Sequence, residues 1–229
     1  MINGEIGAVS DAGTEQRSRA EIYASLGDLR LARSVGEMAL ATHRAAEARW
    51  EELPDLVLLA DVTQDAGDDV ASRDYLRAAR GLVSTMDARS ARIDVALAEA
   101  RIAQRSGNPG AVVRILNAAR QDVTDAGYDV EAEAATLRAR ALFALGDLDS
   151  AIAAGRRAVT AVEHVRSGLN SGVLRTAYTS DRLDAYATLA SILVASGNAE
   201  AAFEVADAAH GRALLENLAL GQSREAIQE

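Results

Sequence analysis

Small and apolar residues recur along the chain at the three- and four-residue steps of an α-helix. One such stretch runs through Leu56, Leu59, Ala60 and Thr63 and ends just before a glycine. Another begins two residues after a glycine and occupies residues 148–159. Side chains at these steps share one face of a helix, so each stretch predicts an amphipathic helix with one buried face.

A glycine followed by Asp or Asn separates successive helical stretches. These glycines, called the turn glycines below, stand at positions 27, 67, 107, 146 and 197, at steps of 40, 40, 39 and 51 residues. Glycine adopts the left-handed conformation that ends a helix without a Cβ penalty. The Asp or Asn that follows can cap the next helix through its side-chain oxygen. The pattern therefore predicts about five helix–turn–helix units and an all-α fold.

The composition agrees with a helical chain. Of its 229 residues 49% are hydrophobic but only 3% are aromatic, so the apolar residues are mostly Ala, Leu and Val. Ala and Leu favour helices, whereas strands favour β-branched and aromatic residues. The two prolines, Pro54 and Pro109, leave long stretches without a helix breaker.

Charge and cysteine usage exclude several functions. The net charge is −10 and every basic residue is arginine, which argues against a nucleic-acid binder because such proteins need a basic face. The absence of cysteine excludes disulfides, thiolate zinc sites and a cysteine nucleophile within the chain. No signal peptide or long apolar run is visible, so we expect a cytoplasmic protein that does not bind membranes.

The repeat resembles the tetratricopeptide repeat (TPR) family. That family has a small residue in the first helix, a large residue three positions later, Gly-Asp or Gly-Asn at the turn, and small residues in the second helix. The residues that fit are Ala20, Tyr23, Gly27, Asp28, Ala32 and Ala39 in the first unit, Ala139, Leu142, Gly146, Asp147, Ala151 and Ala158 in the fourth, and Ala190, Leu193, Gly197, Asn198, Ala202 and Ala209 in the fifth. Ser72 and Val112 replace the expected alanine in the second and third units.

The TPR resemblance implies a right-handed superhelical solenoid whose concave groove binds extended polypeptides. We expect the solenoid to span residues 13–222. Residues 1–12 would form a flexible N-terminus or a partial cap, and residues 223–229 a linker-like tail. The inferred role is a non-catalytic scaffold or sensor module that binds a protein or peptide partner.

A second resemblance covers about residues 170–218. The 51-residue step inserts Val165–Ser171 and then Leu174–Arg182, and the last unit continues through Ala201–Glu216. These segments are similar to the region that precedes the protease-like CHAT domain in bacterial TPR–CHAT proteins, although His210-Gly211 stands where that family often has Arg-Ala. In that family a downstream domain cuts a target with a His/Cys pair. The resemblance implies a fragment of such a protein, or a natural protein that lacks the effector domain.

A regulator of transcription and an enzyme are two other classes of function with which the sequence can be compared. The effector-binding region of a bacterial transcription regulator can carry similar repeats and remains an alternative. Enzymatic function is not expected, because His43, His164 and His210 lie far apart in the sequence and no zinc-protease, nucleophile-elbow or P-loop motif is present. We expect these histidines to be solvated or partly packed. We therefore assign no catalytic, cofactor-binding or metal-ligating residue.

The TPR register places several polar and aromatic residues on the groove-facing side of the first helices. They are Asp61, Gln64, Asp65, Arg101, Gln104, Arg105, Arg140 and Phe143. Arg101 and Arg105 are one helical turn apart, and with Arg140 they could clamp a carboxylate. The alternative is that the three arginines pair with Asp94, Glu99, Glu131 or Glu133 and only stabilise the stack. The apolar residues of the last helix, residues 201–220, predict a homodimer through that helix.

Overall fold

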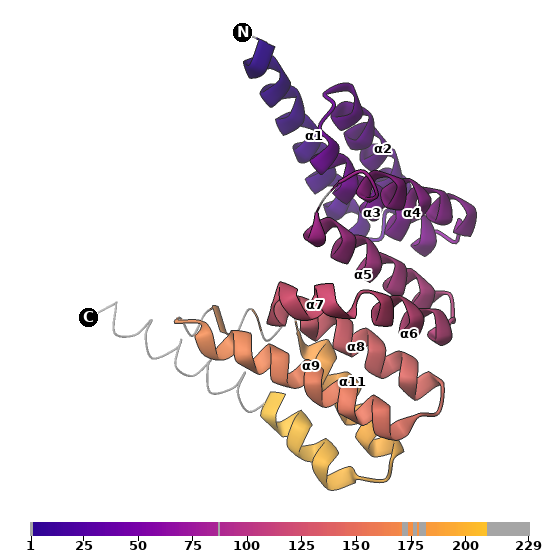
Figure 1. Cartoon of the computed structure of the whole chain (residues 1–229), viewed down its shortest axis with the longest axis vertical. Helices are drawn as coiled ribbons and strands as arrows, with labels where there is room; N and C mark the ends of the chain where they lie inside the picture. Colours follow the sequence, from indigo (N-terminus) through magenta and orange to yellow (C-terminus); the bar gives the residue numbers. More distant parts are fainter. Residues whose placement is uncertain (1, 87, 171–173, 176–177, 179–181, 210–229) are drawn as a thin grey trace. The chain divides into compact units, whose positions relative to one another are not determined.

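The structure is a computed structural model that describes residues 2–86, 88–170, 174–175, 178 and 182–209. Within these residues the regular secondary structure is entirely α-helical, which confirms the expected fold class (Figure 1). The helices are α1 (Ile2–Ser25), α2 (Leu29–Ala45), α3 (Arg49–Asp65), α4 (Asp69–Val83), α5 (Arg89–Arg105), α6 (Pro109–Ala118), α7 (Arg120–Ala126), α8 (Tyr128–Ala144), α9 (Leu148–Gly168) and α11 (Leu183–Ala195). Residues 199–209 are also helical.

The five turn glycines join helices in the way that the sequence predicts. Each has a positive φ, between 66° and 81°. Each donates its N–H to the carbonyl three residues earlier, and the next residue donates to the carbonyl five residues earlier, the bond pair of a Schellman motif. The following Asp or Asn then accepts a hydrogen bond from the N–H three residues on, as Asp28 does from Leu31 at 3.0 Å. Local chemistry alone therefore sets these helix ends.

Substituting the turn glycine Gly67 should cost stability, whereas substituting Gly81, a helical glycine with open space around it, should not. Gly67 has a φ of +79° and Gly81 lies inside α4, and a Cβ would meet no atom within 4 Å at either site. Gly67→Ala should lower the free energy of unfolding by about 1–2 kcal/mol, the penalty of a left-handed Ala. Gly81→Ala should raise it by about 0.5–1 kcal/mol through helix propensity. Urea unfolding followed by circular dichroism measures both, and a change of the same sign would contradict the assignment.

The small residues that mark the repeat lie where helices pack most closely. Ala20, Ala60 and Ala139, each seven residues before a turn glycine, are fully buried. The positions five residues after the glycines are equally buried at Ser72 and Val112, which depart from the expected alanine. The same positions relative to the turn are therefore buried in several of the helix pairs.

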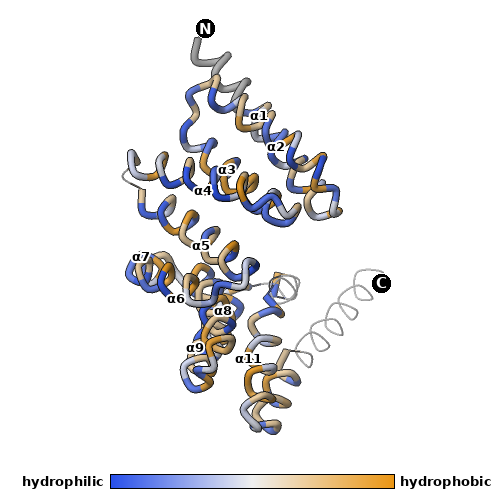
Figure 2. The backbone as a smooth tube through the Cα atoms, turned by 90° about the vertical axis from the view of Figure 1, so that its right-hand side faces the viewer, coloured by the Kyte–Doolittle hydropathy of each residue, from blue (hydrophilic) through white to orange (hydrophobic). Residues whose placement is uncertain are grey.

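The chain divides into two compact units, Met1–Ile102 and Ala103–Glu229, and the division falls inside α5. The N-terminal unit has an apolar core around Leu56 and Leu59, and the C-terminal unit has one around Val162 and Tyr186. In Figure 2 apolar and polar stretches alternate along the helices, as an amphipathic pattern requires. The sequence predicts one continuous array over residues 13–222, preceded by a flexible N-terminus or partial cap at residues 1–12. In the structure, residues 2–12 form the first part of helix α1.

A buried ionic cluster holds three helices of the N-terminal unit together. His43 on α2 and Asp55 on α3 are both fully buried, and His43 Nδ1 lies 2.5 Å from Asp55 Oδ2. Arg17 on α1 donates to Asp55 Oδ1 at 3.4 Å and to Glu51 Oε2 at 3.2 Å. Burial raises the pKa of Asp55, and the hydrogen bonds from His43 and Arg17 oppose that shift. The expectation of a solvated or partly packed His43 was wrong.

Residues that follow the long helix α9 form hydrogen bonds with helices α8 and α9. Tyr178 and Arg182 both donate to Asp129 Oδ1 at the start of α8, at 3.0 and 2.8 Å. The pKa of Tyr178 is raised to about 12 by burial and by this hydrogen bond. Tyr186 donates to Glu163 on α9. Aromatic and arginine residues of this segment therefore have structural contacts within the chain.

Candidate functional site

A hollow of about 340 Å³ lies in the C-terminal unit between the end of α5, the second half of α8 and the middle of α11. Each of these helices precedes a turn glycine, so each is the first helix of its pair. We call this cavity the α8–α11 hollow. It is lined by Gln104, Arg140, Phe143, Ala187, Thr188, Ser191 and Ile192.

Three of the residues that the sequence predicts for the groove line this hollow. They are Gln104, Arg140 and Phe143. Gln104 and Phe143 each stand three residues before a turn glycine, whereas Arg140 and Ser191 each stand six residues before one. Equivalent positions of successive helix pairs therefore face the same cavity.

Arg140 provides the positive charge of the hollow. Its Nε donates to Thr188 Oγ1 at 3.1 Å, and its Nη2 donates to Asp184. The side chains of Arg140 and Asp184 are 38% and 58% exposed. An ion pair with this exposure contributes about 1 kcal/mol or less, because water screens both charges. A ligand carboxylate can therefore exchange with Asp184 at small cost.

The remaining lining combines an amide, hydroxyl groups and apolar surface. The side-chain oxygen of Gln104 is buried and has no hydrogen-bond partner within the described residues, and an unpaired buried acceptor costs about 1–3 kcal/mol. Phe143 is 39% exposed at the rim, and Ile192 forms part of the wall. Such a surface can accept a backbone N–H, pair with a carboxylate and cover an apolar side chain.

Other predicted groove residues lie in the N-terminal unit. Arg101 Nη2 donates to Asp61 Oδ2 at 3.2 Å, and both residues stand six positions before a turn glycine. Gln64 donates to Asp69 Oδ1 at 3.0 Å, at the start of α4. Asp65 is the exposed last residue of α3. Arg101 therefore has Asp61 as an acidic partner.

Arg105 completes the predicted set and belongs to the C-terminal unit. It is the exposed last residue of α5. Arg105 does not line the α8–α11 hollow, although Gln104 beside it does. Of the three arginines proposed as a clamp, Arg140 alone lines this cavity.

Four residues of the hollow escaped the sequence prediction, and all of them lie on α11. They are Ala187, Thr188, Ser191 and Ile192. The register that identifies Arg140 also identifies Ser191, because both stand six residues before a turn glycine. Small and hydroxyl side chains do not suggest a binding role in a sequence as clearly as a guanidinium group does.

The described residues form neither a metal site nor a membrane-spanning helix. No three His, Cys, Asp or Glu side chains gather closely enough there to hold a metal ion. Among the same residues, no helix has both the length and the apolar character that a membrane crossing requires. His164 stacks against Tyr128, with ring centroids 3.7 Å apart.

The last helix, for which the sequence predicts dimerisation, is described up to residue 209. Phe203 is 71% exposed, whereas Val205 packs against the core of the C-terminal unit. Leu214, Leu215 and Leu218, on which the dimer prediction depends, lie outside the described residues, as does the tail at 223–229. The dimer through this helix stays a prediction.

No protein-family model matches the chain, and no curated protein shows significant sequence similarity to it. Its function must therefore be inferred from its own residues.

Proposed function

We propose that the chain is a non-catalytic scaffold of the tetratricopeptide type that binds a polypeptide through the first helices of its helix pairs. The observation that carries the proposal is the α8–α11 hollow, in which Gln104, Arg140 and Phe143 come together from two helix pairs. The repeated Gly-Asp or Gly-Asn turns and the buried small residues support the TPR assignment. A superhelical arrangement of the pairs belongs to the same proposal.

The ligand that fits the hollow best is an extended peptide with a carboxylate next to an apolar side chain. The carboxylate would replace Asp184 on Arg140, since guanidinium groups bind carboxylates in a bidentate manner. The apolar side chain would pack on Phe143 and Ile192. The free oxygen of Gln104 would accept a backbone N–H of the peptide. Phe143 and the Gln104 oxygen then gain contacts that they lack in the unbound chain.

Within this proposal the module is the sensor region of a CHAT-type protein. The support is the sequence similarity over residues 170–218. Proteolytic activity, if it accompanies this module, belongs to a separate domain. A cytoplasmic location is part of the same proposal.

Selection of peptides from a random display library against the full chain tests the binding site. Selected peptides should carry an acidic group beside an apolar residue, and Arg140→Ala or Phe143→Ala should weaken them about tenfold, the effect of losing one central contact. Phe203→Ala removes an aromatic ring that is 71% exposed and does not line the hollow, so it should leave the affinity unchanged. Equal affinity for all three variants would refute the proposed site.

The wider three-arginine clamp has its own test. Charge reversal of Arg101 and Arg105 together should weaken the selected peptides only if the ligand also contacts α5 at these positions. Unchanged affinity in that double variant, with loss in Arg140→Ala, would confine the site to the α8–α11 hollow.

A further inference from the structure

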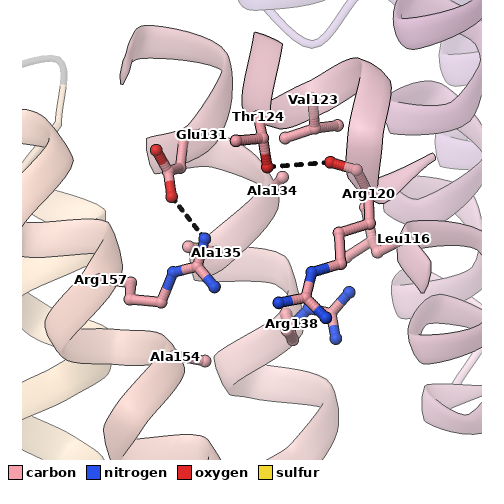
Figure 3. Close-up of a pocket in the computed structure, with 10 residues that line it drawn as sticks. All are labelled: Leu116, Arg120, Val123, Thr124, Glu131, Ala134, Ala135, Arg138, Ala154 and Arg157. Carbon is pink, nitrogen blue, oxygen red and sulfur yellow. Dashed lines mark hydrogen bonds and ion pairs between the residues drawn. The ribbon is translucent and has the colours of Figure 1, made fainter. Parts of the chain in front are cut away.

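A second cavity of about 150 Å³ lies in the C-terminal unit among α6, α7, α8 and α9 (Figure 3). Its lining includes Arg120, Glu131, Arg138 and Arg157. We call it the arginine pocket. It is separate from the α8–α11 hollow, because Arg138 and Arg140 are two residues apart on α8 and so stand on nearly opposite sides of that helix.

The arginine pocket concentrates positive charge in an acidic protein. Three arginines line it and Glu131 is the one acidic residue in its lining. Glu131 pairs with Arg157 at 2.6 Å. Arg138 donates to the neutral side chain of Asn117 at 2.7 Å, and neither Arg120 nor Arg138 has a carboxylate partner within the described residues. Two positive charges therefore have no carboxylate partner in the part of the chain that the structure describes, although the net charge of the chain is −10.

The positive charges around the arginine pocket disfavour the charged form of Arg138. Burial lowers the pKa of Arg138, and the positive charges of Arg120 and Arg157 lower it further. Figure 3 shows the guanidinium group of Arg138 next to that of Arg120, while Arg157 points into the same pocket from α9. Like charges held together in a partly buried site repel one another. A bound anion would replace this repulsion with attraction between the anion and the guanidinium groups.

We infer that the arginine pocket binds a phosphate monoester. A phosphate monoester carries about −1.5 to −2 charges at pH 7, which matches the two uncompensated guanidinium groups, whereas a carboxylate would neutralise only one. Arg groups bind phosphate oxygens through paired, charge-assisted hydrogen bonds. The apolar floor of Leu116, Val123 and Ala154 accommodates the organic part of the ester. This site does not depend on peptide binding at the α8–α11 hollow.

Calorimetric titration of the full chain with phenyl phosphate tests the inference, with benzoate as a monoanion of similar shape. Phenyl phosphate should bind the native chain, and benzoate should bind at least about tenfold more weakly. Arg138→Gln keeps a donor for Asn117 but removes the charge, so it should weaken phenyl phosphate about tenfold or more, the effect of a lost charged hydrogen bond. Arg156→Gln is the matched control on α9, because Arg156 does not line the pocket, and it should bind phenyl phosphate normally.

Two outcomes would overturn the inference: no binding of phenyl phosphate to the native chain, or equal binding to the Arg120→Gln/Arg138→Gln double variant. Thermal melting followed by circular dichroism shows whether the double variant is folded. Because this variant loses like-charge repulsion, it should melt at or above the melting temperature of the native chain. Phenyl phosphate should raise the melting temperature of the native chain and of Arg156→Gln, but not that of the Arg120→Gln/Arg138→Gln double variant.

The source of the ester is distinguished by comparing free phosphoserine with a phosphoserine peptide and its unphosphorylated form. Tighter binding of the phosphopeptide, lost in Arg138→Gln, supports the site with a phosphorylated polypeptide as the source. Equal binding of free phosphoserine and the phosphopeptide supports it with a small phosphate ester. The variants of the arginine pocket should leave the affinity of peptides at the α8–α11 hollow unchanged. The two proposed sites can therefore be refuted independently of each other.

Discussion

Replacing Asp55 with alanine is expected to lower the free energy of unfolding by about 3–5 kcal/mol, the usual effect of removing one partner from a buried ion pair. The carboxylate of Asp55 is fully buried between His43 and Arg17, at 2.5 and 3.4 Å. The raised pKa of Asp55 shows that burial outweighs the hydrogen bonds in its effect on the charged form. The loss therefore arises from the positive charge of Arg17, whose side chain is only 15% exposed, and not from a large net gain of the intact pair.

Asp74→Ala is the matched control for Asp55→Ala. Asp74 pairs with Arg77 at 2.6 Å, but the two side chains are 59% and 75% exposed. Removing an exposed pair changes the stability by about 1 kcal/mol or less. Urea unfolding followed by circular dichroism compares the two variants. Equal small losses would show that the cluster of Arg17, His43 and Asp55 does not hold α1, α2 and α3 together.

Leu59→Ala is expected to lower the free energy of unfolding by about 2–5 kcal/mol. Leu59 on α3 is fully buried in the core of the N-terminal unit. Its side chain reaches toward α2, where a Cβ added to Gly36 would lie 3.0 Å from Leu59 Cδ2. Neighbouring helices cannot easily close around the space that Leu59 fills, because the facing residues Gly36 and Ala20 are already small.

Gly36→Ala provides a complementary test of the same contact. In the native chain the new methyl group would press on Leu59 and should cost about 1–3 kcal/mol. In the Leu59→Ala background the methyl group would fill part of the cavity, and alanine would favour the helix by about 1 kcal/mol. The double-mutant cycle should therefore show a coupling of at least about 1 kcal/mol. Additive effects would contradict close packing of α2 against α3.

Local features of this fold were predictable from the sequence. The turn glycines and the capping residues after them act within five residues of chain, so their pattern identifies the helix ends without tertiary information. The buried alanines follow from the same register, since each lies at a fixed distance from its turn. The register of the repeat also predicts that Gln104, Arg140 and Phe143 face the same groove, and all three line the α8–α11 hollow.

Features that depend on contacts between distant segments were not predictable. Asp55 is 12 residues from His43 and 38 residues from Arg17, and no local motif links them. Thr188 and Asp184 reach Arg140 across the irregular 51-residue step. The arginine pocket forms where α6 ends and α7 begins, at Ala119, and neither Gly nor Pro marks that break in the sequence.

Photo-crosslinking from within the α8–α11 hollow tests the central proposal most directly. A photoreactive amino acid at Ser191, which lines the hollow, should crosslink to the selected acidic peptide, and Arg140→Ala should abolish the product. The same group at Arg156, which lines neither cavity, should give no product. Crosslinking from Arg156 but not from Ser191 would contradict a peptide site on the first helices of the pairs.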